Sequence, residues 1–191
     1  MLGLTGSNAA GKGEVAAYLR RLDFAVASLS DVVREEARAR GLPPEREHLI
    51  RIGNLLREQG GPGALAQRIL PRLGDRDVVD SIRNPAEVTV LRHLNYFRLV
   101  GVRAPLQVRF ARSRERARPG DPTTLAQFRQ REEQENSTDP AAQQLTETFR
   151  LADRIIDNDA GLPALHSRID RLLEELERAA ASADTSGPPI G

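Results

Sequence analysis

The chain has 191 residues, of which 39% are hydrophobic, so it is long enough for one domain with a sizeable buried core. Its 28 basic and 27 acidic residues leave a net charge of +1, and only 4% of the residues are aromatic. This balance argues against a nucleic-acid partner, because duplex binders carry a broad basic surface and single-strand binders carry aromatic platforms. Cysteine is absent, which excludes disulfides and cysteine-based metal or nucleophile chemistry.

The sequence gives no sign of a membrane or export segment. No apolar run approaches the roughly 18 residues that a membrane-spanning helix needs. The first polar motif also lies too close to Met1 to leave room for a signal peptide. We therefore expect a cytoplasmic protein with no membrane partner, either a monomer or a homodimer.

The first motif is the stretch GSNAAGKGEV, which begins at Gly6. The apolar residues 2–5 before it predict a short buried strand, and residues 14–21 after it have helix-forming composition. Small residues between a strand and a helix can curl their backbone N–H groups around a phosphate, and the helix N-terminus adds a favourable dipole. The spacing follows the phosphate-loop pattern G-x-x-x-x-G-K-[ST], except that Gly13 stands where a hydroxyl would bind magnesium.

The lysine of this motif has no counterpart elsewhere in the sequence. Of the 28 basic residues only Lys12 is a lysine, and all the others are arginine. A phosphate loop needs a compact ammonium on a flexible stem, which a planar guanidinium does not replace. The pattern therefore favours a working phosphate loop over a chance turn, with Lys12 at the outer phosphates.

Strands alternate with helices along the rest of the chain. Further strands are expected over residues 24–28, 78–80, 97–102 and 154–157. Helices are expected from the Ser30–Asp31 cap to 39, over 45–58 and 64–73, from a capping box at Asn84, from 105 to 118, from a capping box at Thr124, and over 162–176. This alternation predicts a parallel sheet with helices on both faces. We expect one domain over residues 1–180, a small helical lid over about 109–140, and a disordered tail over 181–191.

The loop resembles that of the P-loop nucleotide kinases. Adenylate-kinase-like members read G-K-G-T here, so Gly13 fits that variant and Glu14 departs from it. The resemblance implies a three-layer P-loop NTPase fold that binds ATP and Mg²⁺. The residues that it assigns to the nucleotide are Gly6, Ser7, Asn8, Ala9, Ala10, Gly11, Lys12, Gly13 and Glu14. Without a loop hydroxyl, phosphates, waters and a nearby acid would hold Mg²⁺. Glu14 either contacts a water of that ion or favours the first helical turn.

The stretch SLSDVVREEARARG follows the second expected strand, and its polar side chains lie at the sheet edge where ligands bind. It resembles the adenylate-kinase segment in which an acid and an arginine three residues later face the acceptor, and here these are Asp31 and Arg34. It also resembles dephospho-coenzyme-A kinase, where an Asp takes the proton of the acceptor hydroxyl. The resemblance implies a catalytic Asp31 and a substrate-binding Arg34. The alternative is a capping Asp and a surface Arg.

The stretch VVDSIRNPAEV places Asp80 at the end of a buried strand. An acid at this point suits a water-mediated magnesium contact. The stretch resembles D-G-x-R-x-P-x-E of uncharacterised archaeal P-loop proteins and D-G-F-P-R of adenylate kinases. That resemblance implies that Arg83 binds the substrate phosphate. The alternative is a helix entry with an incidental arginine.

The stretch RFARSRERARPGDP carries Arg109, Arg112 and Arg116 on one helical face. In nucleotide kinases a lid at this point brings arginines onto the transferring phosphoryl group, which stabilises charge in the transition state. The resemblance therefore implies that Arg112 and Arg116 are catalytic. The alternative is a solvated basic face.

The stretch LADRIIDNDAG resembles A-D-x-I-I-x-N near the end of dephospho-coenzyme-A kinases, where the Asn region lies beside the nucleotide base. Asn158 would take that place, unless it is only a turn residue. His48, His93 and His166 show no metal-ligand spacing and are expected at the surface or in packing positions.

These motifs predict a phosphotransferase that moves the γ-phosphoryl group of ATP to a nucleotide-like acceptor, a nucleoside or deoxynucleoside monophosphate. Dephospho-coenzyme-A kinase is one alternative. A non-catalytic NTP-binding regulator is another, because an acid at position 14 could weaken metal-assisted transfer.

Overall fold

The computed structural model describes residues 1–117 and 120–184 and contains one five-stranded parallel sheet. The strands are β1 (Leu2–Thr5), β2 (Ala25–Ser28), β3 (Asp77–Asp80), β4 (Arg98–Arg103) and β5 (Arg154–Asp157). Their spatial order is β2-β3-β1-β4-β5, so β1 lies at the centre and hydrogen bonds to both β3 and β4. The loops that follow β1 and β3 therefore leave the same sheet edge next to each other, as expected for a parallel sheet.

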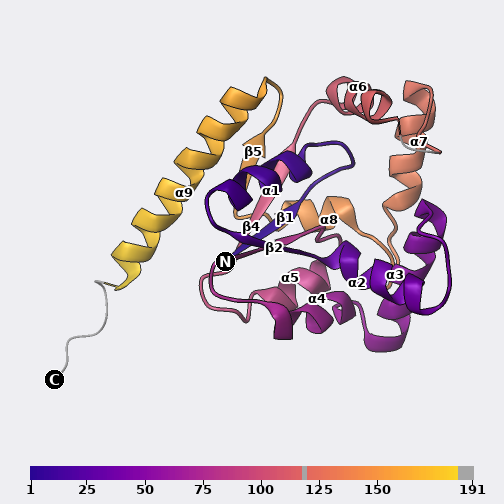
Figure 1. Ribbon diagram of the computed structural model, residues 1–191, viewed down its shortest axis with the longest axis horizontal. Helices are drawn as coiled ribbons and strands as arrows, with labels where there is room; N and C mark the ends of the chain where they lie inside the picture. The colour runs from indigo at the N-terminus through magenta and orange to yellow at the C-terminus, as the bar shows by residue number, and fades with distance from the viewer. Residues whose placement is uncertain (118–119, 185–191) are drawn as a thin grey trace.

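The helices surround this sheet (Figure 1). They are α1 (Lys12–Arg21), α2 (Leu29–Ala39), α3 (Arg46–Gly60), α4 (Ala64–Ile69), the 3₁₀ turn η1 (Leu70–Arg72), α5 (Pro85–Leu91), α6 (Leu106–Arg116), α7 (Leu125–Glu135), α8 (Leu145–Arg150) and α9 (Leu162–Asp184). None of the helices within the described residues is both long and apolar enough to cross a bilayer.

The core consists of two apolar layers, one on each face of the sheet. Helices α1 and α9 bury Leu19 and Ile169 against one face, together with Val100 of β4. Helices α2 to α5 bury their apolar faces on the other side, where Leu99 of β4 points. Consecutive strand residues therefore serve opposite layers, which is the pattern of a sheet buried on both faces. The three-layer α/β architecture expected from the sequence is confirmed.

The predicted elements are confirmed with four differences. Helix α2 is capped by Ser28, whose hydroxyl accepts from the Ser30 N–H, and not by Ser30 or Asp31. The expected helix over 64–73 stops at Ile69, because Pro71 cannot donate to an α-helical ladder and a 3₁₀ turn follows. Helix α9, expected over 162–176, continues to Asp184 and so includes the first residues of the expected tail, while 185–191 lie outside the described residues.

The fourth difference is α8, which the sequence did not predict. This six-residue helix has too few turns to show a clear apolar period. A tertiary contact fixes its start, because the Gln144 N–H donates to the Arg83 carbonyl at 2.8 Å. By contrast, the capping boxes expected at Asn84 and Thr124 are both present, at the starts of α5 and α7.

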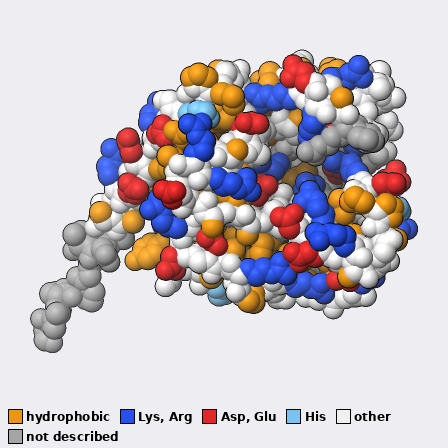
Figure 2. Space-filling view, viewed as in Figure 1, with side chains coloured by type: hydrophobic (Ala, Val, Ile, Leu, Met, Phe, Trp, Pro, Cys, Tyr) orange, Lys and Arg blue, Asp and Glu red, His pale blue; other side chains and the backbone are white. Residues whose placement is uncertain are grey.

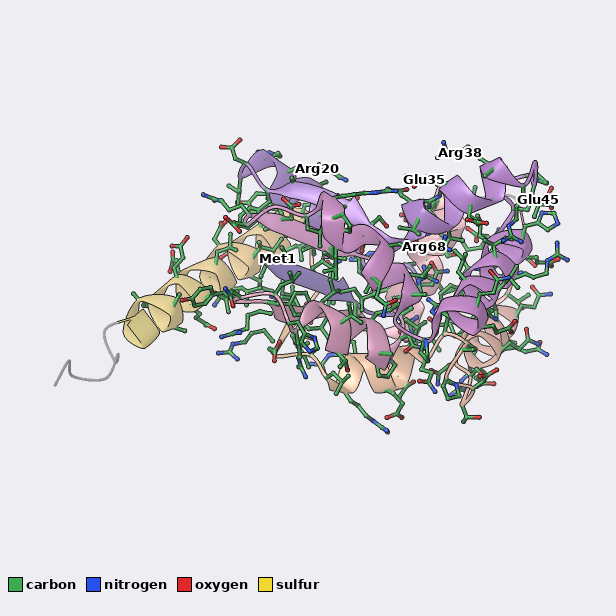
Figure 3. All side chains as sticks on the ribbon, turned by 90° about the horizontal axis from the view of Figure 1, so that it is seen from below. Met1, Arg20, Glu35, Arg38, Glu45 and Arg68 are labelled. Carbon is green, nitrogen blue, oxygen red and sulfur yellow. The ribbon has the colours of Figure 1, made fainter. Side chains whose placement is uncertain are left out.

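Helices α6 and α7 form an arm at the sheet edge where β1 and β3 end, and α7 lies beside α3 (Figure 1). This arm occupies the chain segment that the sequence analysis assigned to a lid. Seen from below, Glu45, just before α3, lies near one end of the molecule, and Arg20 of α1 lies nearer its middle (Figure 3).

Candidate functional site

The loop between β1 and α1 has two glycines that no other residue could replace without strain. Gly6 has φ +141°, and a Cβ there would lie 2.2 Å from the Val102 carbonyl oxygen. Gly11 has φ +99°, and a Cβ there would lie 2.0 Å from Nδ2 of Asn158. At Gly13, by contrast, a Cβ would meet nothing within 4 Å. The loop is therefore fitted closely to β4 and β5 at its first two glycines and is open to solvent at its third.

The side chain of Lys12 folds back over this loop. Its Nζ donates to the carbonyl oxygens of Gly6 at 2.6 Å and Ser7 at 3.1 Å. The pKa of Lys12 is lowered from 10.5 to about 8, first by burial and second by the charge of Arg83, while the carboxylate of Asp80 opposes the shift. The ammonium thus lies in a cationic, partly dehydrated site that an anion would stabilise.

Asp80 and Arg83 lie beside the loop, as the order of strands requires. The Asp80 carboxylate ends β3 and accepts from the Ser81 N–H at 2.6 Å. The Thr5 hydroxyl donates to the Ile82 carbonyl at 2.9 Å, which ties this segment to the end of β1. Arg83 donates to Oε1 of Gln143 at 2.9 Å, and its pKa is lowered by burial first and by the charge of Arg46 second.

Arg112 of α6 reaches the phosphate loop through Asn158. The amide of Asn158 donates to the Ala10 carbonyl at 2.9 Å and accepts from Nη2 of Arg112 at 3.2 Å. The other terminal nitrogen of Arg112, Nη1, is buried and has no hydrogen-bond partner in the described part of the chain. It would lie 3.7 Å from a Cβ at Gly11. Arg112 thus lies beside the loop, and Asn158 connects the two through one hydrogen bond to each. We call these two hydrogen bonds the Asn158 clamp.

The other arginines of α6 have different surroundings. Arg116 donates to Asp121 at 3.1 Å, in the connection to α7, while its Nε is a second buried nitrogen without a partner among the described residues. Arg109 donates to the Ala104 and Asn8 carbonyls and pairs with Glu132 of α7. Arg109, which the sequence analysis placed on this face without giving it a role, therefore lies as close to the loop as Arg112 does.

Asp31 and Arg34 form an exposed ion pair of 2.7 Å on α2. Arg34 lines a cavity of about 550 Å³ together with Arg83 and Ser81. Asp31 is not among the lining side chains, and 56% of its side chain is exposed. The structure thus brings Arg34 and Arg83, which the sequence analysis assigned to the substrate, into one cavity, and it leaves Asp31 outside the lining, in contact with Arg34.

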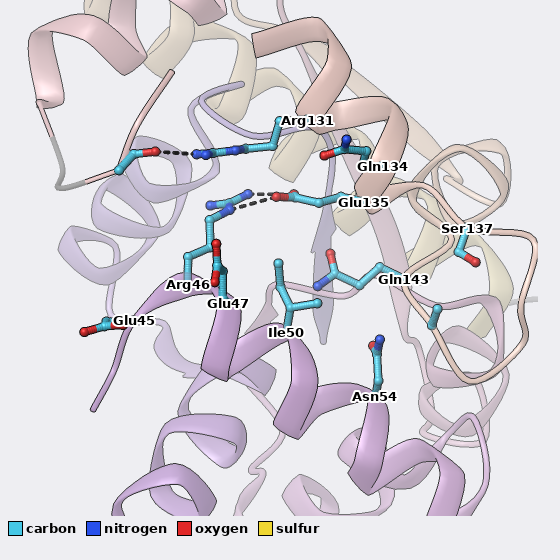
Figure 4. A pocket seen from close by; sticks show the side chains of 12 residues that line it. Glu45, Arg46, Glu47, Ile50, Asn54, Arg131, Gln134, Glu135, Ser137 and Gln143 are labelled. Atoms are coloured by element: carbon cyan, nitrogen blue, oxygen red, sulfur yellow. Dashed lines mark hydrogen bonds and ion pairs between the residues drawn. The ribbon is translucent and has the colours of Figure 1, made fainter. Parts of the chain in front are cut away.

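A second cavity of about 580 Å³ adjoins the first. Both are lined by Glu45, Arg46, Ile50 and Gln143, and the second extends to α7 (Figure 4). A space-filling view shows a hollow on one face of the molecule with Lys and Arg side chains gathered around it (Figure 2). Within the described residues no cluster of three His, Asp or Glu side chains could hold a metal ion by itself. The first cavity, whose lining includes Arg34, Arg46, Arg57 and Arg83, offers the binding of an anionic group.

Two ion pairs of this region were missed by sequence reasoning. Arg46 and Glu135 pair through two hydrogen bonds of 2.7 and 2.6 Å. Arg57 and Glu87 form a fully buried pair of 2.7 Å between α3 and α5. Arg46 carried one detectable signal: it is the first residue of α3, where the helix dipole disfavours a cation. The sequence around Arg57 contains no such signal, because its partner Glu87 belongs to a different helix, α5.

Comparisons with known proteins are consistent with this architecture. No protein-family model matches the chain. A protein of Hyperthermus butylicus named UPF0200 protein is 36% identical over 177 residues, which cover 91% of this chain and 92% of that protein. A UPF0200 protein of Pyrococcus abyssi is 33% identical over 182 residues, which cover 91% of this chain and 95% of that protein.

Solved structures resemble the chain in fold. A shikimate kinase from Bacteroides thetaiotaomicron aligns with a TM-score of 0.60 at 17% identity, over 92% of this chain and 97% of its own. The protein TT1252 from Thermus thermophilus aligns with a TM-score of 0.58 at 22% identity, over 92% and 96%. At these identities the likeness extends to the three-layer P-loop fold and no further. By its relatives, the chain belongs to the UPF0200 protein family.

Proposed function

We propose that the chain transfers the γ-phosphoryl group of ATP to a small-molecule acceptor, and that this acceptor is a nucleoside or deoxynucleoside monophosphate. The observation that carries the proposal is the convergence of three features on one loop. Gly6 and Gly11 leave no room for a side chain, the dehydrated Lys12 ammonium lies over the loop, and Arg112 presents a buried nitrogen without a partner beside it. Together they form a cationic cradle for a polyphosphate.

The residues present fit ATP as the phosphoryl donor. The backbone from Gly6 to Gly13 and the N-terminus of α1 would hold its phosphates, and Lys12 would exchange its bonds to loop carbonyls for bonds to phosphate oxygens. Arg112 has an unused donor for the same purpose. The Asn158 amide is already hydrogen-bonded to the Ala10 carbonyl and to Arg112. Asn158 would therefore act on the nucleotide indirectly, by holding the loop in place.

The residues also fit Mg²⁺, provided that the nucleotide contributes ligands. The carboxylate of Asp80 lies beside the loop, close enough to Lys12 to oppose the lowering of its pKa. Mg²⁺ keeps several waters and takes one or two carboxylates plus phosphate oxygens in such sites. Asp80 would therefore hold the ion through water, and the ion would neutralise charge on the phosphates.

The chain's own residues would act by position and charge. Arg34 and Arg83 would bind the anionic group of the acceptor in the cavity that they share. Arg112 and Arg116 would stabilise charge that develops on the phosphoryl group, and both have buried nitrogens that could donate to it. Asp31, which pairs with Arg34 of this cavity, would orient the acceptor oxygen for attack. Helices α6 and α7 would exclude water from this space.

The test is an acceptor screen read by ADP release, at several Mg²⁺ concentrations. The panel holds nucleoside monophosphates, deoxynucleoside monophosphates and dephospho-coenzyme A, which covers the principal alternative acceptor. We expect turnover with a monophosphate and its loss in Lys12→Ala. If Lys12→Ala leaves both ATP binding and turnover unchanged, the proposal is wrong.

A regulatory NTP-binding protein is the second candidate. The observation in its favour is the open end of the loop, where Gly13 and the exposed Glu14 offer no hydroxyl to a metal. Isothermal titration separates the two functions. Tight ATP binding without transfer to any acceptor of the panel supports the regulator.

A further inference from the structure

Arg46 lies where the two cavities meet. It lines the cavity that contains Arg34 and Arg83, and it also lines the second cavity, which extends to α7. No other arginine among the residues described as lining the two cavities belongs to both. A guanidinium at this junction can contact a molecule in either cavity. Whether it can bind such a molecule depends on the side chain with which it is now paired.

That partner is a carboxylate from the arm. Glu135, at the last position of α7, accepts two hydrogen bonds from Arg46, at 2.7 Å from Nε and 2.6 Å from Nη2 (Figure 4). The exposed fractions of the two side chains are 32% for Arg46 and 8% for Glu135. A planar guanidinium binds a phosphate group with the same two-pronged geometry as a carboxylate. The Glu135 carboxylate therefore already occupies an anion position at the cavity junction.

The other arginines of the first cavity differ in how far their charge is compensated. Arg57 is neutralised by the buried carboxylate of Glu87, and Arg34 pairs with the exposed carboxylate of Asp31. Arg83 donates its side-chain bond to the neutral amide of Gln143. Arg46 is close enough to lower the pKa of Arg83, so the two guanidinium groups repel each other. An anion placed between them would relieve that repulsion.

The sequence position of Arg46 points the same way. It is the first residue of a fifteen-residue helix, where the positive end of the dipole disfavours a cation. Residues that break a local preference without a local gain are expected at functional sites. The N-terminus of α3 and the Arg46 side chain both favour an anion at this point, where Glu45 and Glu47 also line the cavities.

We propose that Arg46 is an acceptor-binding residue and that Glu135 occupies its anion position until the acceptor arrives. This inference rests on the proposed function. Because Arg34, Arg46 and Arg83 line one cavity, the acceptor class is a molecule with a doubly charged anion such as a phosphate monoester. Binding then exchanges one partner of Arg46 for another and releases Glu135 from α3, so acceptor binding and the position of α7 are coupled.

The two halves of the ion pair allow a sharp test, because the inference gives them opposite effects. Arg46→Gln removes the cation, and we expect the Kd of the monophosphate to rise at least about tenfold, as the loss of a charge-assisted hydrogen bond implies. Glu135→Gln removes the internal competitor, and we expect the Kd to fall, by roughly threefold or more. The double variant should bind as weakly as Arg46→Gln alone.

Arg72→Gln is the matched control. Arg72 and Glu35 form a two-pronged pair of the same kind, at 2.9 and 2.8 Å, and neither residue lines the two cavities. Glu35 lies on the outer side of α2, near Arg68 (Figure 3). The Kd of this variant should equal that of the original chain. Thermal unfolding of all four variants verifies that each one folds.

The measurement is isothermal titration without ATP, with AMP, GMP, CMP, UMP and dTMP as probes and with shikimate as a singly charged comparison. If both single variants shift Kd in the same direction, Arg46 and Glu135 only fasten α3 to α7, and the inference is overturned. Absence of binding by every monophosphate also overturns it. Because ATP is left out, a failure of phosphoryl transfer is recorded separately, by the acceptor screen. The expected result is weaker binding in Arg46→Gln and tighter binding in Glu135→Gln.

Discussion

Gly11 of the phosphate loop and Asn158 at the end of β5 are in such close contact that a Cβ on Gly11 would lie 2.0 Å from the Asn158 amide nitrogen. These residues are 147 positions apart in the chain and meet because the loop after β1 and the segment after β5 leave the same edge of the sheet. The same amide holds Arg112, so the loop, the last strand and the arm share one polar contact.

This contact predicts different effects of alanine at two glycines of one loop. Gly11→Ala forces a left-handed backbone on a residue with a side chain and displaces Asn158, so it should cost about 1–3 kcal/mol of unfolding free energy and abolish ATP binding. Gly13→Ala has open space and an unstrained backbone in α1, so it should be as stable as the original chain or more stable by up to about 1 kcal/mol. Urea unfolding and ATP titration of both variants measure the difference. Equal stability of the two would contradict the role of the close contact.

The Asn158 amide itself gives a second prediction. Asn158→Ala leaves the buried Ala10 carbonyl without its donor and Arg112 without its acceptor, so the unfolding free energy should fall by about 1–3 kcal/mol. ATP should bind at least about tenfold more weakly, because the loop is no longer held in place. Denaturant unfolding and calorimetry measure both quantities. An unchanged ATP affinity would mean that the Asn158 clamp is not needed for the loop.

The pKa of Lys12, lowered from 10.5 to about 8, predicts how ATP binding depends on pH. Phosphate binding requires the ammonium, so ATP affinity should be constant below about pH 8 and then fall by up to about tenfold per pH unit above it. Titration at a series of pH values measures this. In Lys12→Ala the same titrations should show no such fall, and a fall of equal size would assign the effect to another group.

The same shift has an opposite effect on stability without ligand. Because the folded pKa lies below the unfolded value, the unfolded chain binds more protons between about pH 8 and about pH 10.5. The contribution of Lys12 to the free energy of unfolding should therefore rise with pH through this window. Urea unfolding of the original chain and of Lys12→Ala, at about pH 8 and about pH 10.5, isolates the contribution of Lys12 to the free energy of unfolding.

The buried pair of Arg57 and Glu87 gives a stability prediction. Arg57→Met leaves the Glu87 carboxylate, which has no exposed surface, without its counter-charge and should cost roughly 3–5 kcal/mol. Glu87 also accepts the backbone N–H groups of Arg83 and Asn84, so Arg83 should lose its position and the acceptor affinity should fall with it. Arg72→Gln, at an exposed pair, should leave the unfolding free energy nearly unchanged.

Glu14 provides a test of how the metal is held. Glu14→Thr restores the hydroxyl of the G-K-G-T variant at an exposed position of the first turn of α1, so the fold should be unaffected. Turnover should then rise or its Mg²⁺ dependence should become tighter, because a hydroxyl adds a ligand to the ion. The acceptor screen repeated at several Mg²⁺ concentrations measures this. Such a gain would mean that the natural site holds its metal without a loop hydroxyl, whereas no change in either quantity would contradict a contact between position 14 and the ion.

The sequence by itself determined the class of fold and the position of the glycine loop after β1. Apolar runs, caps and turns act within a few residues, so they predicted all five strands and the capping boxes at Asn84 and Thr124. The spacing of Gly6, Gly11 and the single lysine predicted the loop for the same reason: the backbone geometry of a phosphate loop is local. Asp80 and Arg83 could be placed beside it because parallel strands end at one edge.

Only the tertiary structure decided which side chains share a partner. Whether Arg109, Arg112 or Arg116 reaches the loop depends on how α6 packs, because equal spacing on one helical face gives all three the same sequence signal. The pairing of Arg46 with Glu135 joins residues 89 positions apart, and no local pattern encodes it. An ion pair depends on distance in space, and the sequence specifies that distance only through the packing of the whole chain.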